Sequence, residues 1–477
     1  MGGSGAPGPG AGLLAYGTPA GRWVLAAAVL GSGITALDST VVGIALPSIA
    51  RTFHTGLGAL QWVVTAYTLT LASFLLIGGS LGDRLGRRHV FSVGVVWFMV
   101  ASMLCGLAPS AVVLIIARAL QGVGGALLTP GSLAIIQASF RPDDRGRAIG
   151  AWSGLGGLAT AAGPLIGGYL IAAASWRWVF YINVPVSLVV LIIAARHVPE
   201  SKDPSVTGRV DTPGAALTVV FLAGLAAGLI EGPTLGWTSP VIVVSLVAAV
   251  VSLPALLWVE HRQANPMIPL ALFKVRQFAA ANAVTFVVYG ALGGALFLLP
   301  VVLQTVAGYT PLASGLALLP ITVLMLVFSA RSGRLAARIG PRLQMSVGPM
   351  VAGVGLLLLV RAPTSGTYLR QVFPSMMVFG AGLAITVAPL TATAMSAAPP
   401  EHAGVASAVN NVVARAAGLL AVAILPLLAG IAGTSALAPT TLASGFKTAM
   451  IIAGVTCIAG GLLAALTIRN STGARAS

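Results

Sequence analysis

The sequence predicts an all-α polytopic membrane protein of fourteen spanning helices. Of its 477 residues, 57% are apolar and 8% are charged, whereas soluble domains carry about 25% charged residues. A hydrocarbon core about 30 Å thick needs about 20 apolar residues for each helical span. The gaps between apolar stretches do not exceed about twenty residues, too few for a soluble domain of about fifty. This composition excludes a water-soluble enzyme.

Fourteen apolar stretches are long enough to cross a bilayer. We expect helices, because lipid gives the backbone no hydrogen-bond partners and the period-two pattern of a barrel is missing from the sequence. Arg118 and Glu231 interrupt the fourth and seventh stretches. The predicted spans are 22–49, 59–81, 89–108, 111–134, 147–173, 178–196, 213–231, 240–259, 278–303, 313–335, 343–361, 370–392, 404–431 and 445–468.

The ends of the chain and the basic residues predict its topology. Residues 1–20 are rich in Gly and Pro and lack the pattern of a signal peptide, so we expect a flexible tail. With an even number of spans, both termini lie on one side. The loops and tails of that side hold 19 of the 26 Lys and Arg residues, and the opposite loops hold 5. The positive-inside rule therefore predicts cytoplasmic termini. Because these residues form short runs between spans, we do not expect nucleic acid binding.

An internal repeat divides the chain into halves. The segment GSLGDRLGRR at 79–88 returns as GRLAARIGPR at 333–342, and Pro130 is echoed by Pro389. Two homologous bundles with two helices between them fit these offsets, and duplicated bundles are typical of alternating-access transporters. The predicted units are a tail (1–20), an N-terminal six-helix bundle (21–200), two linker transmembrane helices (201–262), a C-terminal six-helix bundle (263–468) and a tail (469–477).

Two opposite charges lie deep in predicted spans. Asp38 is roughly 24 Å from the cytoplasmic end of the first span, and Arg118 lies at a comparable depth in the fourth. A carboxylate there costs about 2.5–3.5 kcal/mol unless it is paired, hydrated or protonated. We interpret Asp38 as a proton carrier and Arg118 as its partner, with Gln121 in the same network. The alternatives are an Asp satisfied by a neighbour for packing and a permanent structural ion pair.

The loop after the second span combines glycines with charges. Glycines permit a tight turn, and an acid can accept from the adjacent arginines, so the loop could latch one conformation. Alternatively, the arginines only set topology. Ala337 replaces the acid in the second copy, so only the first latch is complete. The predicted latch comprises Gly79, Asp83, Arg84, Gly86, Arg87 and Arg88.

The fifth span is crowded with small residues around a proline. Small residues let helices pack closely, and proline removes a helical hydrogen bond. A hinge and generic tight packing are both compatible with this pattern. The candidate hinge residues are Gly163, Pro164, Gly167 and Gly168.

Further polar and aromatic side chains could line a substrate cavity, although each aromatic residue could equally face lipid or a neighbouring helix. Arg415, about 17 Å from the cytoplasmic end of its span, would meet a helix carbonyl or a bound anionic group. Glu231 is interpreted as an interfacial residue. Cys105 and Cys457 are interpreted as packing residues, and we expect no metal or cofactor. The cavity candidates are Trp62, Tyr67, Gln121, Trp152, Tyr289, Asn411 and Arg415.

These motifs together resemble the fourteen-helix drug:proton antiporter branch of the major facilitator superfamily. The similar segments are LDSTVVGIALP (37–47), GSLGDRLGRR (79–88), IARALQG (116–122), AAGPLIGG (161–168) and SWRWVFYINVP (175–185). The resemblance implies proton-driven export by two rocking six-helix bundles. It implies Asp38 as the proton-linked acid, Arg118 as its relay partner, the loop as latch and Gly163 with Pro164 as antiporter hinge.

The leading prediction is therefore a proton-coupled exporter of drugs, antibiotics or related amphipathic molecules in a bacterial cytoplasmic membrane, with small molecules, protons and lipid as partners. Direct ATP use is not expected, because none of the three lysines belongs to a P-loop. The alternatives are a dedicated exporter of one endogenous metabolite and a transport-inert membrane sensor. Because Asp38 is the one carboxylate predicted deep in a span, beside Arg118 and Arg415, we expect neutral, zwitterionic or anionic substrates rather than dications.

Overall fold

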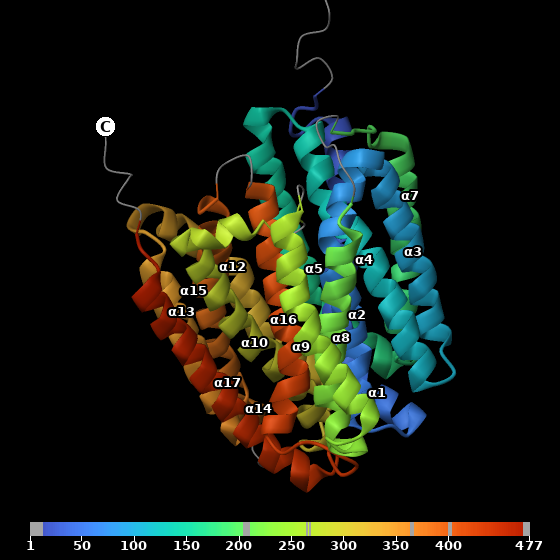
Figure 1. Cartoon of the computed structure of the whole chain (residues 1–477), viewed down its shortest axis with the longest axis vertical. Helices are drawn as coiled ribbons and strands as arrows, with labels where there is room; N and C mark the ends of the chain where they lie inside the picture. The colour runs from blue at the N-terminus through green and yellow to red at the C-terminus, as the bar shows by residue number, and fades with distance from the viewer. Residues whose placement is uncertain are drawn as a thin grey trace, which may run out of the picture.

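The computed structural model describes residues 13–203, 210–263, 266, 269–362, 367–398 and 403–470. Within these residues, fourteen helical segments are long and apolar enough to cross a membrane, which confirms the predicted fold class. The first helix begins and the last helix ends at the same end of the bundle, at the top of Figure 1. We call this end the termini face and the opposite end the far face.

Several helices extend beyond the predicted spans. The α-helices are α1 (Pro19–Phe53), α2 (Leu57–Leu85), α3 (Arg87–Leu107), α4 (Ala111–Ser139), α5 (Pro142–Ala173), α6 (Trp178–Tyr181), α7 (Asn183–His197), α8 (Thr212–Leu235), α9 (Pro240–Arg262), α10 (Arg276–Thr305), α11 (Pro311–Ala317), α12 (Leu319–Ile339), α13 (Arg342–Leu358), α14 (Tyr368–Gln371), α15 (Phe373–Ser396), α16 (Ala403–Leu428) and α17 (Pro439–Thr467). Two short 3-10 helices are η1 (Leu270–Lys274) and η2 (Leu359–Arg361).

The start of α1 lies inside the segment that we predicted to be a tail. Thr18 caps the helix, since its hydroxyl accepts a hydrogen bond from the Gly21 amide, and Pro19 follows as the first helical residue. Before it, the Leu14 amide donates to the Ser139 carbonyl at 2.8 Å. Residues 13–18 are therefore held against the α4–α5 turn, and the first twelve residues of the predicted tail lie outside the described residues.

Four predicted spans contain more than one helix. The eleventh consists of α13 and η2, and the twelfth includes the end of α14 and most of α15. The other two are interrupted near their starts: the sixth consists of α6 and α7, and the tenth consists of α11 and α12. Pro320 at the start of α12 lacks the amide hydrogen that a continuous helix needs from it, which accounts for the break at Leu318. Both interruptions lie toward the far face.

The first seven helices form an N-terminal bundle (α1–α7) and the last eight form a C-terminal bundle (α10–α17). In the N-terminal bundle, α4 packs on α2 and α3, while α1 packs on α5 and α7. Gly78 and Gly122 permit the close approach of α2 and α4, because a Cβ at either residue would strike the backbone of the other helix.

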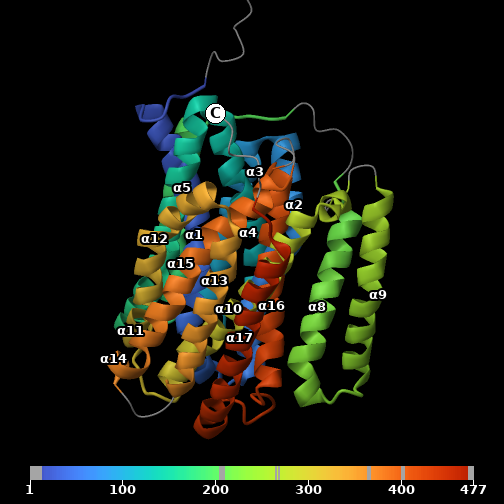
Figure 2. The ribbon, with the colours of Figure 1, turned by 90° about the vertical axis from the view of Figure 1, so that its left-hand side faces the viewer.

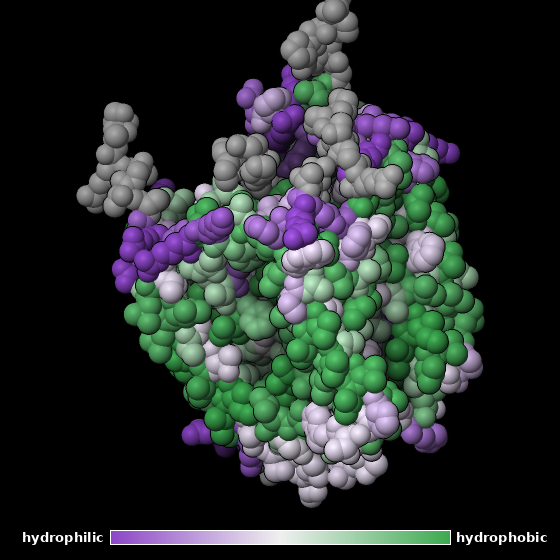
Figure 3. Space-filling view, in the orientation of Figure 1, coloured by the Kyte–Doolittle hydropathy of each residue, from purple (hydrophilic) through white to green (hydrophobic). Residues whose placement is uncertain are grey.

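Helices α8 and α9 stand beside the two bundles (Figure 2). They pack on each other, and α8 also contacts α2 and α16, one helix from each bundle. The outer side of α9 exposes large apolar side chains such as Val244, Val250 and Trp258. Figure 3 shows a broad apolar belt between polar residues at the termini face and at the far face. This surface suits a hydrocarbon environment, so the chain is a multi-pass membrane protein.

The two bundles meet toward the far face. The Gln61 side chain donates to the Val422 carbonyl at 2.7 Å, and the Gln304 side chain donates to the Ile44 carbonyl at 3.0 Å. Among the described residues, these are the two hydrogen bonds that join the bundles directly, and all four residues lie in the far halves of their helices. The far end of the seam between the bundles is therefore closed.

The termini half of α5 is different. A Cβ added at Gly146, Gly150, Gly154 or Gly157 would meet no atom within 4 Å. By contrast, a Cβ at Gly168, in the far half of the same helix, would lie 2.7 Å from the Pro311 carbonyl oxygen of α11. Helix α5 therefore contacts the C-terminal bundle near the far face and loses such close neighbours toward the termini face.

Candidate functional site

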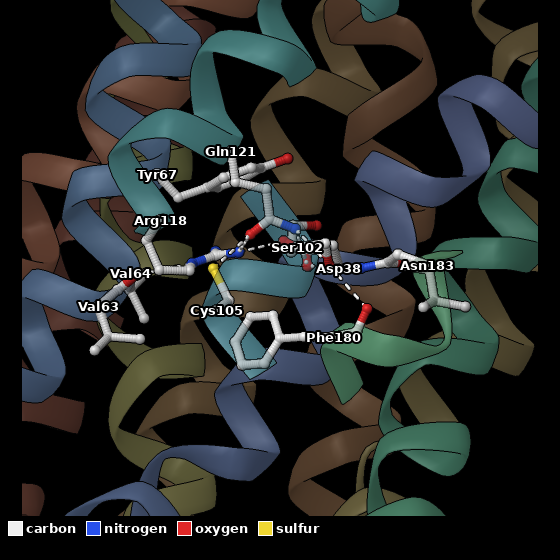
Figure 4. Close-up of polar contacts among 12 residues, drawn as sticks. Asp38, Val63, Val64, Tyr67, Ser102, Cys105, Arg118, Gln121, Phe180 and Asn183 are labelled. Atoms are coloured by element: carbon white, nitrogen blue, oxygen red, sulfur yellow. Dashed lines mark hydrogen bonds and ion pairs between the residues drawn. The ribbon is translucent and has the colours of Figure 1, made fainter. Parts of the chain in front are cut away.

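Asp38 and Arg118 form a buried ion pair in the centre of the N-terminal bundle (Figure 4). The Arg118 Nη1 atom donates to Asp38 Oδ2 at 2.5 Å, and neither residue is more than 1% exposed. The sequence predicted that these two residues share a depth, and the structure brings them together. Since a buried charge without a partner is costly, each side chain supplies the counter-charge that the burial of the other requires.

Neutral groups complete the coordination of both charges. Asp38 Oδ1 accepts from Gln121 Nε2 at 2.9 Å and from Asn183 Nδ2 at 3.2 Å. The Arg118 Nε donates to the Val63 carbonyl at 3.1 Å, and its Nη1 also donates to Gln121 Oε1 at 2.7 Å. Four helices, α1, α2, α4 and α7, thus supply the two charges and the groups bonded to them.

Helical spacing places these groups on one side of each helix. Along α4, Arg118, Gln121 and Gly125 are separated by three or four residues and share a buried face. The Arg118 guanidinium lies 4.1 Å from the centroid of the Tyr67 ring on α2. This cation–π contact covers the face of the guanidinium that the hydrogen bonds in its plane leave open.

Ser102 and Asn183 are the site residues that the sequence analysis missed. The Ser102 hydroxyl accepts from Gln121 Nε2 and Asn183 Nδ2 at 3.2 and 3.0 Å, and it donates to the Phe180 carbonyl at 2.8 Å. Asn183 lies within the segment SWRWVFYINVP, where an amide in an apolar run was the available signal. Ser102 gave no comparable signal, because serine is common in membrane helices.

The latch residues contact the N-terminal bundle and the segment that follows α7. Asp83 Oδ1 accepts from Arg87 Nη2 at 2.8 Å, and the Arg88 guanidinium donates to the Val198 carbonyl at 3.2 Å. The Glu200 carboxylate accepts from the amides of Arg88 and His89 at the start of α3. In the described part of the chain, the side chains of Asp83, Arg87 and Arg88 do not pair with the C-terminal bundle.

The other latch residues have local roles. Gly86 has a φ of 120°, which favours glycine, and it ends α2 at the start of α3. Gly79 lies beside Pro130 of α4. Arg84 lies in the last turn of α2.

The predicted hinge residues lie where α5 contacts two helices. A Cβ at Gly163 would strike the Thr40 hydroxyl of α1, and one at Gly167 would lie 3.0 Å from Val41. On another side, Gly168 faces Pro311, and the Pro164 carbonyl lies against Gly315 of α11. These four residues therefore let α5 touch both α1 and the C-terminal bundle.

The predicted cavity residues separate into two groups. Trp62 donates to Glu231 of α8 at 2.8 Å, and Trp152 donates to the Ser32 hydroxyl of α1 at 2.8 Å, so both indoles serve helix contacts. Tyr67 of the N-terminal bundle and Tyr289 of the C-terminal bundle each lie within electrostatic range of Arg415. Asn411, one turn before Arg415, is exposed, and its side-chain amide donates to the Ser407 carbonyl.

The chemistry of this site is ionic and neutral-polar. Within the described ranges, no group of three or more His, Cys, Asp or Glu residues is placed to hold a metal ion. The two cysteines are buried and unpaired. The arrangement can hold or exchange a proton at one carboxylate and can attract a negative group at an arginine.

Comparisons with known proteins agree with this architecture. A family model described as Major Facilitator Superfamily matches residues 28–422. The chain is 38% identical to multidrug resistance protein Stp of Mycobacterium tuberculosis (strain CDC 1551 / Oshkosh) over 81% of this chain and 72% of that protein. It is 36% identical to the tetracenomycin C resistance and export protein of Streptomyces glaucescens over 85% of this chain and 75% of that protein. A crystal structure of a D-xylose–proton symporter shares the fold with a TM-score of 0.68 at 16% identity, covering 95% of this chain and 99% of that one.

Proposed function

The chain belongs to the Major Facilitator Superfamily, and from that premise we propose that it is a proton-coupled exporter of drugs or antibiotics. Transport rather than enzymatic catalysis is the activity of this family, and both relatives named above are called resistance proteins. The observation that carries the proposal is the buried Asp38–Arg118 pair. We place the protein in the bacterial cytoplasmic membrane with both termini in the cytoplasm, on the strength of the Lys and Arg distribution.

Proton binding at Asp38 would change the energy of the centre of the N-terminal bundle. A protonated Asp38 no longer balances Arg118, which keeps its neutral acceptors, the Val63 carbonyl and Gln121 Oε1. Removing one partner of a buried ion pair costs about 3–5 kcal/mol. A membrane potential supplies about 2.3 kcal/mol per charge per 100 mV. The two energies are of the same order, so protonation can shift the balance between two conformations.

The burial of Asp38 supports the coupling of proton transfer to conformational change. The side chain is fully enclosed in this conformation, so a proton can reach or leave it only after the surrounding helices rearrange. We assign the closed far end of the seam to an inward-facing arrangement, in which the termini half of α5 lines the cytoplasmic opening. The small residues at Gly163 and Pro164 serve as the antiporter hinge, and Asp83 with the nearby arginines serves as a latch that forms in another conformation.

Reconstituted protein tests the proposal. Proteoliposomes with an imposed pH gradient should accumulate tetracenomycin C, the compound in the name of one relative, and Asp38→Asn should lose this accumulation. The amide keeps the size of the side chain and loses the exchangeable proton. If this compound is not transported, the same assay is repeated with other antibiotics.

Asp143→Asn is the matched control. Asp143 lies exposed in the first turn of α5, so the same chemical change there should leave gradient-driven accumulation intact. Accumulation by Asp38→Asn at the rate of the parent protein would show that Asp38 is not the coupling acid. Indifference of the parent protein to the pH gradient, for every compound that it moves, would reject proton coupling itself.

A further inference from the structure

Arg415 is a positive charge in the middle of the membrane that the coupling site does not use. It is the thirteenth residue of α16, a helix of 26 residues. Four ion pairs occur among the described residues, and none of them includes Arg415. Its Nε is buried without a hydrogen-bond partner in the part of the chain that the structure describes.

The surroundings of Arg415 lie at the seam between the bundles. Tyr67 of the N-terminal bundle and Tyr289 of the C-terminal bundle both interact electrostatically with its guanidinium. The Tyr67 hydroxyl is likewise buried and without a hydrogen-bond partner among the described residues. Two unsatisfied donors, one from each bundle, thus lie near the interface of the repeats, where secondary transporters hold their substrates.

Two packed faces of α16 flank the position of Arg415. Leu419 and Ala423 of α16 pack with α2 and α8, and Gly418 lies against Tyr289 and Gly293 of α10. Arg415 lies between these two packed faces. Asn411, one turn nearer the termini face on the same stripe, is exposed although it lies within a spanning helix. The stripe is therefore accessible at Asn411 and partly buried at Arg415.

We propose that Arg415 binds an anionic group of the transported substrate, so that organic anions are among the substrates of this protein. The inference rests on the export function proposed above and names its substrate class. A guanidinium presents paired donors that match the two oxygens of a carboxylate or sulfonate. An apolar environment strengthens that attraction relative to water. The bound anion would supply the counter-charge that the described residues do not.

Tyr67 connects this position to the coupling site. Its ring lies on Arg118, the partner of Asp38, while its hydroxyl lies within electrostatic range of Arg415. Binding of an anion at Arg415 reduces the positive field that acts on Tyr67 and on the ion pair behind it. Substrate binding and proton binding can therefore influence each other through one side chain.

A matched pair of probes tests the proposal. Anilinonaphthalenesulfonate and phenylnaphthylamine share one aromatic body, and only the former carries a negative charge. Equilibrium dialysis against protein in phosphatidylcholine nanodiscs, with empty nanodiscs as the blank, should show tighter binding of the sulfonate. Arg415→Gln should weaken sulfonate binding at least about tenfold, the factor expected for a lost hydrogen bond to a charged group. Binding of the neutral amine should be unchanged.

Two further variants separate recognition from folding. Arg415→Lys keeps the charge without the paired donors and should give intermediate sulfonate affinity. Arg370→Gln removes an exposed arginine from the short helix α14 and should leave both probes unaffected. Equal affinity of the parent protein for the two probes would overturn the proposal. An equal loss of affinity for both probes in Arg415→Gln would also overturn it.

Lipid is the other source of an anion. The dialysis is therefore repeated in phosphatidylglycerol nanodiscs. If this lipid lowers sulfonate binding by the parent protein to the level of Arg415→Gln, and does not change binding by that variant, Arg415 binds a headgroup phosphate. That result would overturn the proposal. These binding results can be distinguished from a failure of the proposed export function. If the protein binds the sulfonate as described but its transport does not respond to a pH gradient, proton coupling is refuted and anion recognition at Arg415 is not.

Discussion

The two bundles each place one arginine near the middle of the membrane, and the surroundings of the two side chains differ. Arg118 of the N-terminal bundle is bonded to Asp38, Gln121 and the Val63 carbonyl, with an aromatic ring on its face. Arg415 of the C-terminal bundle has no counter-charge among the described residues. A fully bonded arginine is part of the internal balance of the protein, whereas an unbonded one is available to a ligand.

The polar cores of the bundles differ in the same way. In the C-terminal bundle, the Asn410 amide of α16 donates to Asn282 Oδ1 and to the Thr285 hydroxyl of α10 at 3.1 and 2.9 Å. These contacts join two helices with neutral groups only. The duplicated architecture has therefore concentrated paired charge in the first bundle. In the described part of the second bundle, the Asn410 contacts are neutral, and Arg415 lies near the seam.

The largest predicted effect is the difference in stability loss when each of the two arginines is replaced. Arg118→Gln leaves Asp38 buried without its counter-charge and should destabilise the protein by about 3–5 kcal/mol. Arg415→Gln removes a charge that has no partner among the described residues and should cost less than about 1 kcal/mol. Titration with sodium dodecyl sulfate, followed by circular dichroism, measures both changes. Asp38→Asn combined with Arg118→Gln should recover part of the loss, and an additive double variant would show that the ion pair is not coupled.

The second prediction compares the closed and open ends of the seam along α5. Gly168→Ala should strain the far-face contact, because its Cβ would lie 2.7 Å from the Pro311 carbonyl oxygen. Overpacking of this kind costs about 1–3 kcal/mol, enough to favour separation of the bundles at that end. Gly150→Ala, at a position with no neighbour within 4 Å, is the control. Spin labels at Arg51 and Leu369, both exposed toward the far face, should report a longer distance in Gly168→Ala alone.

An unchanged distance in Gly168→Ala would indicate that the α5–α11 contact does not hold the far face closed. A longer distance in both variants would instead reflect a general effect of alanine on α5.

Much of this architecture could be predicted from the sequence because the bilayer restricts the options. Apolar stretches of spanning length must be helices, and their number and the fold class were confirmed. Asp38 and Arg118 could be singled out because charges are rare in such stretches, and Gln121 because it lies one helical turn after Arg118. Helix ends were harder to predict. Pro19 begins α1 inside the predicted tail, since a Thr cap with a following Pro starts a helix before hydropathy rises.

Neutral partners could not be predicted in the same way. Ser102 and Asn183 matter because of the direction in which α3 and α7 face, and rotation of a helix about its axis depends on tertiary packing. Trp62 and Trp152 illustrate the same limit. Both are aromatic residues of a type that often lines a cavity. In the structure, however, their indoles donate hydrogen bonds to Glu231 and Ser32 and so join neighbouring helices. Arg415 was recognised as unusual from depth alone, and the structure added that no described partner neutralises it.

The smallest predicted effect compares the amides of the two bundles. Asn183→Leu removes a donor to the buried carboxylate of Asp38 and should cost about 1.5–3 kcal/mol, since hydrogen bonds to charged groups are the stronger kind. Asn410→Leu removes donors to neutral acceptors in a membrane interior and should cost about 0.6 kcal/mol, the average for such bonds. Both are measured by the same detergent titration. Equal costs would mean that the charge on Asp38 adds nothing to the bond, and the contrast between an ionic and a neutral core would then lose its energetic basis.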